Sequence, residues 1–206
     1  MGIKREAMSE DTEERITPRE GGTAPTMNLP SVTECLKPFM DFSKVPLDVL
    51  AAAAARGTEV HSICACISKK LWVFNIPEFC TGYVNSFRGW LDSMVEEVVL
   101  AEERLYDRSL GFHGMPDLIC RIKGDLGLTL VDLKTGKVVQ SSWEVQIAAY
   151  RHLAIKAGYP VHRILSLRLS ADGKPPIINE STKGMDQLFN VFVSALNCYR
   201  HFYGGK

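Results

Sequence analysis

Apolar and polar positions follow two different periods along the chain, and these periods divide it into helical and strand segments. Residues 1–29 are polar, charged and interrupted by Gly and Pro without either period, so we expect a flexible tail there. The clearest helical pattern has apolar residues three and four positions apart and ends near Glu97. The predicted longer helices cover 46–69, 77–97, 141–157 and 183–202.

Two stretches carry the capping-box pattern, in which a Ser and a Glu three residues later bond the free amides at a helix start. They are Ser31-Val-Thr-Glu34 and Ser141-Ser-Trp-Glu144. The first predicts a short helix at the beginning of the fold, and the second predicts the first turn of the helix over 141–157.

Alternation with a period of two begins after the second long helix and predicts strands. The expected strands cover 98–106, 110–123, 127–134, 161–169 and 176–179. The first three would form a meander, with Gly124–Gly127 as one turn. A strand, helix and strand after the meander predict a mixed sheet that contains a right-handed parallel crossover. We therefore expect an α/β fold, with a central mixed β-sheet flanked by helices and an N-terminal helical segment.

Composition limits the domain count and the partners. A chain of 206 residues can bury one sizeable core, so residues 30–206 are expected to form one domain with one active site. The formal net charge of zero argues against a strongly basic nucleic-acid binder. However, residues 134–206 hold ten basic and four acidic residues, whereas the acidic excess lies in 31–133. A basic surface and an acidic site are therefore expected in different parts of the fold.

Cysteine spacing and hydropathy indicate the cellular compartment in which the protein is expected. The six cysteines show no paired CxxC spacing, which favours a reducing environment. Neither a signal-peptide core nor a long apolar run is present, so we expect a cytoplasmic protein that does not bind a membrane.

Two carboxylates and a lysine near one hairpin predict a metal-assisted site. Asp117 and Asp132 fall on adjacent predicted strands, and hard ions such as Mg²⁺ or Mn²⁺ prefer oxygen ligands. Lys134 lies two residues after Asp132, hence on the same face, where it can orient a water or stabilise a phosphate. Leu133 points into the core, while its backbone carbonyl could ligate the metal. An exposed charge pair and a Gly-Pro turn are the alternatives for these motifs.

Two helices add further candidates. His61 could ligate the metal, or it could be an ordinary hydrogen-bonded histidine at the edge of the core. Gln146 and Tyr150 lie four residues apart and share a helix face, which could contact nucleic acid or simply be packed and solvated.

Other residues complete the candidate site. Glu102 and Glu103 precede the hairpin, and because side chains alternate along a strand only one can face the site; Glu102 is preferred as a metal ligand. Trp143 could stack a base or plug the core. The candidate DNA-contacting cations, for which a solvated face is the alternative, are Lys137, Arg151 and Lys156.

Taken in order, His61, Gly114-Met-Pro-Asp117, Asp132-Leu-Lys134 and Gln146-Ile-Ala-Ala-Tyr150 resemble the PD-(D/E)XK nucleases of the RecB-like branch. That branch includes phage-type and mitochondrial genome-maintenance-type exonucleases. The resemblance implies a restriction-endonuclease-like core. Some relatives hold an iron–sulfur cluster through three late cysteines, but only Cys198 lies late here, so no cluster is expected.

The resemblance implies a Mg²⁺- or Mn²⁺-dependent deoxyribonuclease, foremost an exonuclease acting on DNA ends or single strands. A role in recombination or repair, of phage or prophage type and with a partner protein, follows by family analogy. Two alternatives share the fold: a DNA-binding or assembly protein without turnover, and a structure-specific endonuclease.

Overall fold

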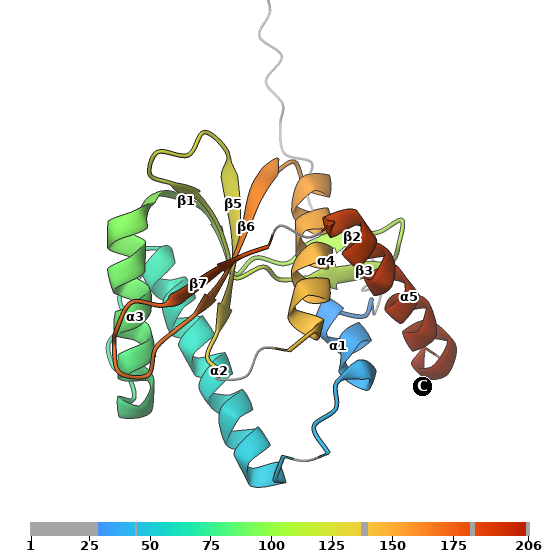
Figure 1. Ribbon diagram of the computed structural model, residues 1–206, viewed down its shortest axis with the longest axis horizontal. Helices are drawn as coiled ribbons and strands as arrows, with labels where there is room; N and C mark the ends of the chain where they lie inside the picture. Colours follow the sequence, from blue (N-terminus) through green and yellow to red (C-terminus); the bar gives the residue numbers. More distant parts are fainter. Residues whose placement is uncertain (1–28, 44, 137–139, 182–183, 205–206) are drawn as a thin grey trace, which may run out of the picture.

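A five-stranded mixed β-sheet runs through the centre of the protein between two layers of helices (Figure 1). The computed structural model describes residues 29–43, 45–136, 140–181 and 184–204. Residues 1–28 of the expected tail and the candidate Lys137 lie outside this part of the chain. The α/β fold with a central mixed sheet and an N-terminal helical segment is thus confirmed.

The strand order in this sheet is β1-β4-β5-β6-β7. All neighbours pair antiparallel except β5 and β6, which run parallel on either side of a helical crossover, as expected. The strands are β1 (Val95–Ala101), β4 (Leu118–Ile122), β5 (Leu128–Lys134), β6 (Val161–Arg168) and β7 (Ile177–Glu180).

Helices cover both faces of the sheet. On one face lie α2 (Leu47–Ser68) and α3 (Glu78–Met94); on the other lie α1 (Val32–Leu36), α4 (Ser142–Lys156) and α5 (Met185–Tyr203). The 3₁₀ turn η1 (Lys37–Phe39) follows α1. Strand β5 shows how the two faces are filled: Leu128 and Leu130 pack toward α4, whereas Val131 and Leu133 pack toward α2 and α3.

The expected strands over 98–106 and 110–123 are each divided in two. Helix α3 ends three residues before the expected Glu97, and β1 starts at Val95 and stops at Ala101. Glu102 then adopts a left-handed backbone with φ +47°. The chain continues into a separate hairpin of β2 (Leu105–Asp107) and β3 (Phe112–Gly114), which packs against α1 and α4. Alternation could not reveal this break, because the residues on both sides of it suit a strand.

The two expected capping boxes differ in outcome. Ser31 accepts a hydrogen bond from the Glu34 amide, and the Glu34 carboxylate accepts one from the Ser31 amide, so this box is confirmed. The box at Ser141 is wrong, since its side chain makes no capping bond and its backbone is already helical. Helix α4 nevertheless begins at the expected place, because the apolar residues on its inner face pack against the sheet.

A buried carboxylate attaches the β2–β3 hairpin to α4. Asp107 is fully buried, and its Oδ1 accepts hydrogen bonds from Lys156 Nζ at 2.7 Å and from the amides of Ser109 and Leu110. Its Oδ2 lies 2.8 Å from His152 Nε2. Burial alone would raise the pKa of Asp107, but the hydrogen bonds from Lys156, Ser109 and His152 lower it well below its usual range. Lys156 therefore helps to hold the fold together at this point, and because its side chain is still 41% exposed, its contact with DNA stays a prediction.

Among the described residues, no helix combines the length and apolar character that spanning a bilayer requires.

Replacing the buried carboxylate should destabilise the protein. Asp107→Ala leaves two amides and two basic side chains without their acceptor, so we expect a loss of about 3 kcal/mol in the free energy of unfolding. Urea denaturation measures it. The control is Asp172→Ala, which removes an exposed carboxylate paired with Lys174 and should change the free energy of unfolding far less, because water screens an exposed ion pair. Equal losses in the two variants would contradict the anchoring role of Asp107.

The contribution of Asp107 should depend on pH. Its pKa is lower in the folded protein than in the unfolded chain, where an aspartate titrates near about 3.9. Its stabilisation is therefore complete above that pH and is lost as the pH falls toward the lower folded-state pKa. Unfolding free energies at pH 7, 4 and 3 should show the gap between wild type and Asp107→Ala narrowing. A gap independent of pH would show that the carboxylate charge is not what stabilises the hairpin.

Candidate active site

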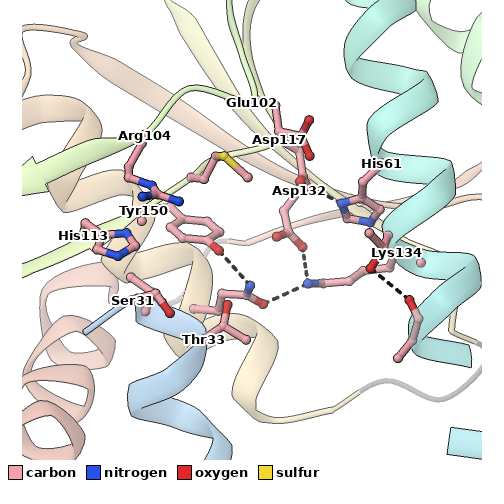
Figure 2. Close-up of a pocket in the computed structure, with 17 residues that line it drawn as sticks. Ser31, Thr33, His61, Glu102, Arg104, His113, Asp117, Asp132, Lys134 and Tyr150 are labelled. Atoms are coloured by element: carbon pink, nitrogen blue, oxygen red, sulfur yellow. Dashed lines mark hydrogen bonds and ion pairs between the residues drawn. The ribbon is translucent and has the colours of Figure 1, made fainter. Parts of the chain in front are cut away.

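A cavity of about 630 Å³ opens where the end of β5 meets the start of β4, with α2, α1 and α4 around it (Figure 2). Its wall gathers polar side chains that are far apart in the sequence. They include His61, Glu102, Arg104, His113, Asp117, Asp132, Lys134, Gln146 and Tyr150. Six of the residues predicted from the sequence thus share one cavity with Glu102, the weaker candidate.

The Asp117 carboxylate joins three elements. Its Oδ1 lies 2.9 Å from His61 Nδ1 on α2, and its Oδ2 accepts a hydrogen bond of 2.7 Å from the Leu133 amide of β5. Burial would lower the pKa of His61, but the charge of Asp117 outweighs it and raises that pKa. In turn, burial would raise the pKa of Asp117, but His61 lowers it. His61 is therefore a hydrogen-bonded histidine at the edge of the core, as the alternative interpretation expected, and it also faces the cavity.

Asp132 and Lys134 form a buried ion pair on the neighbouring strand. Pairing of Leu118 with Val131 brings Asp132 close to Asp117, which directly precedes β4. The Asp132 side chain is 2% exposed, and its Oδ2 lies 2.7 Å from Lys134 Nζ but receives no well-directed hydrogen bond. Burial raises the pKa of Asp132, and Lys134 opposes that rise. This carboxylate therefore needs a cation beside it to stay ionised.

Lys134 also begins a chain of polar contacts along α4. Its ammonium donates to Gln146 Oε1 at 2.9 Å, and Gln146 Nε2 donates to the Tyr150 hydroxyl at 3.0 Å. Burial is the main cause that raises the pKa of Tyr150, whose ring belongs to the core. Because the ring is buried, it cannot stack on a base, and the hydroxyl is the part of Tyr150 that joins the polar contacts of the cavity.

Glu102 enters the cavity because the chain bends there. Its left-handed backbone ends β1, while its amide still donates to the Asp117 carbonyl at 3.1 Å. Glu103 lies on the wall of a different cavity, beside α2 and α3. The preference for Glu102 therefore agrees with the structure, but a backbone strain brings it there and not the regular alternation of a strand.

Carboxylate oxygens that could ligand a metal ion line the cavity, but they do not form a ready coordination site among the described residues. Within the described ranges, no group of three or more His, Cys, Asp or Glu side chains is placed to hold a metal ion. Asp117 is already engaged by His61 and Leu133, and Lys134 occupies one side of Asp132. Mg²⁺ commonly takes one or two carboxylates and completes its shell with water and phosphate, so these residues fit such an ion. The Leu133 carbonyl as a ligand stays a prediction.

The other candidate DNA contacts lie elsewhere. Arg151 points toward α5, with its guanidinium 3.5 Å from an Asp186 carboxylate oxygen. Trp143 lies near the Lys134 ammonium, with 5.2 Å from Nζ to the ring centroid, and lines no part of this cavity. A basic excess in the sequence does not make each cation a contact, because a helix turns some of them toward other helices.

Sequence reasoning missed the opposite wall of the cavity. Arg104 precedes β2 and His113 lies on β3, and both were hidden inside segments expected to be continuous strands. In the sequence, Gly114 stands out only as part of a turn motif. A Cβ added to Gly114 would lie 2.8 Å from atoms of both Tyr150 and Leu153, so the absence of a side chain lets α4 approach β3.

Comparison with models of known protein families and with curated protein sequences gives no match for this chain.

A side chain at Gly114 should disturb the cavity. The Cβ of Gly114→Ala would push Tyr150 and Leu153 of α4 away from β3. We therefore expect a loss of about 1–3 kcal/mol in the free energy of unfolding. The control is Gly89→Ala on α3, where a Cβ meets nothing within 4 Å and should stabilise the helix by up to about 1 kcal/mol. Chemical denaturation of both variants checks the difference. A neutral Gly114→Ala would contradict the close packing described here.

Proposed function

We propose that this protein is a metal-dependent deoxyribonuclease of the PD-(D/E)XK type. The observation that carries the proposal is the meeting of Asp117, Asp132 and Lys134 at one cavity, where the Lys134 ammonium lies 2.7 Å from Asp132 Oδ2. This set can hold a cation, position a water and neutralise a phosphate, which are the tasks of phosphodiester hydrolysis.

The arrangement of elements supports a restriction-endonuclease-like core. Antiparallel strands β4 and β5 carry the acidic pair, a helical crossover follows, and β6 returns parallel to β5. Helix α4 in that crossover presents Gln146 to Lys134. The order of motifs resembles the RecB-like branch in the sequence, and the same residues share a cavity.

Each residue has a distinct role in this proposal. Asp132 and Asp117 would hold Mg²⁺ or Mn²⁺ together with Glu102, and the bound ion would lower the pKa of a water and neutralise the scissile phosphate. Gln146 accepts a hydrogen bond from Lys134 and so positions its ammonium, which would stand beside the reacting phosphate. His61 keeps Asp117 ionised and oriented. The Tyr150 hydroxyl fixes the far side of Gln146.

The proposed substrate is DNA, and the proposed reaction is exonucleolytic removal of nucleotides from ends or single strands in recombination or repair. This part rests on the resemblance to phage-type and mitochondrial genome-maintenance-type exonucleases. The excess of basic residues after position 133 is compatible with it.

The test is cleavage of end-labelled single- and double-stranded DNA with Mg²⁺ or Mn²⁺. We expect Asp132→Asn and Lys134→Met each to reduce the rate at least about a hundredfold, because each removes a group at the reacting phosphate. The control Asp92→Asn removes an exposed carboxylate of α3 and should cleave at the wild-type rate. Thermal melting checks that all variants are folded.

The results separate the alternatives. Absence of cleavage with either metal, or full activity in Asp132→Asn, would contradict the proposal. Binding of DNA in chelator without hydrolysis under any condition would favour the DNA-binding protein. Cutting of circular single-stranded DNA would indicate an endonuclease, since a strict exonuclease leaves a circle intact.

A further inference from the structure

The wall of the cavity opposite His61 and Lys134 is basic. Arg104 and His113 lie there together, on the segment that contains the β2–β3 hairpin (Figure 2). Ser31 and Thr33 line the same part of the cavity. None of these side chains takes part in the hydrolysis proposed above.

The two basic side chains do not have the partners that would explain them structurally. Among the described residues, Arg104 forms no ion pair. His113 Nδ1 is buried and has no hydrogen-bond partner within the same part of the chain. Burial lowers the pKa of His113, and the positive charge of Arg104 lowers it further. Arg104 and His113 thus line one part of the cavity, and His113 keeps a buried ring nitrogen without a partner, which costs free energy.

Glu34 does not supply an anion for this wall. Its charge opposes the lowering of the His113 pKa, but its carboxylate is already engaged by the Ser31 amide in the capping box of α1. The acidic groups of the cavity, Asp117, Asp132 and Glu102, lie on the side away from Arg104 (Figure 2). The basic wall therefore fits an anion that arrives with the substrate.

We propose that Arg104 and His113 form a second phosphate-binding subsite, which holds a phosphate of the nucleic-acid strand other than the one being cleaved. Arg104 supplies the charge and a forked donor, the His113 ring supplies a hydrogen bond, and the hydroxyls of Ser31 and Thr33 can donate to the remaining oxygens. The phosphate can be that of a strand end or an internal one, since both present the same oxygens. This inference rests on the proposed function, because it takes the strand to lie across the cavity.

The experiment measures the affinity of the full chain for a fluorescein-labelled single-stranded oligonucleotide in chelator, where no hydrolysis occurs. Arg104→Gln keeps a polar side chain at an exposed position, so it should fold normally. We expect binding about tenfold weaker than wild type. The slope of log Kd against log salt should fall by about 0.7, the value for one lost contact to a single strand.

Arg108→Gln is the matched control, because Arg108 is an exposed arginine of the adjacent turn and lies outside the cavity. It should bind with the wild-type affinity and salt slope. Oligonucleotides of one sequence with a 5′-phosphate, a 3′-phosphate or neither identify the source. An Arg104 effect confined to one of the phosphorylated strands assigns the subsite to that end, and an equal effect on all three assigns it to an internal phosphate.

Three results would overturn the subsite: wild-type affinity and salt slope in Arg104→Gln, an equal loss in Arg108→Gln, or no binding of DNA by the wild type. The proposed function is judged separately. Weakened binding in Arg104→Gln without metal-dependent cleavage by the wild type would support the subsite and contradict the nuclease. Cleavage by the wild type together with unchanged binding in Arg104→Gln would do the reverse.

Discussion

The Asp117 carboxylate connects the three elements on which the cavity depends. One oxygen lies 2.9 Å from His61 on α2 and the other accepts a hydrogen bond from the Leu133 amide of β5, while the residue itself directly precedes β4. The Asp117 side chain is only 12% exposed, and an anion with so little water around it is stable only beside donors, so its contact with His61 holds α2 against the sheet. Asp132 and Lys134 then project from β5 into the space that this contact defines.

A second carboxylate, Asp107, connects the elements that carry the wall with Arg104 and His113. Asp107 draws Lys156 and His152 of α4 onto the β2–β3 hairpin, and that hairpin is flanked by Arg104 and carries His113. Gly114 completes this packing by letting Tyr150 and Leu153 approach β3. Contacts of Asp117 and Asp107 thus hold the elements that carry the two walls of the cavity.

Period-two alternation predicted correctly that Asp132 and Lys134 share a face while Leu133 enters the core. It failed between residues 98 and 123, because Glu102 adopts a left-handed backbone and the chain leaves the sheet to form a separate hairpin. No side-chain pattern records such a bend in a residue other than glycine. The cap predicted at Ser141 failed for a related reason, since burial of the inner face of α4 starts that helix without a side-chain cap.

The sequence by itself determined the α/β class, the positions of most helices and strands, and the residue types that could act on a phosphodiester. The fold class and the elements follow from the spacing of apolar residues, and the candidate chemistry follows from the residue types, so residues close together in the sequence are enough to show them. Tertiary structure decided which charges are used and how: His61 meets Asp117 across 56 positions, Lys156 is committed to Asp107, Arg151 turns toward α5, and Arg104 with His113 faces the acidic pair. A charged side chain that loses contact with water is stable only beside partners that replace the water. Those partners are distant in the chain, so only the folded structure decides what each charge does.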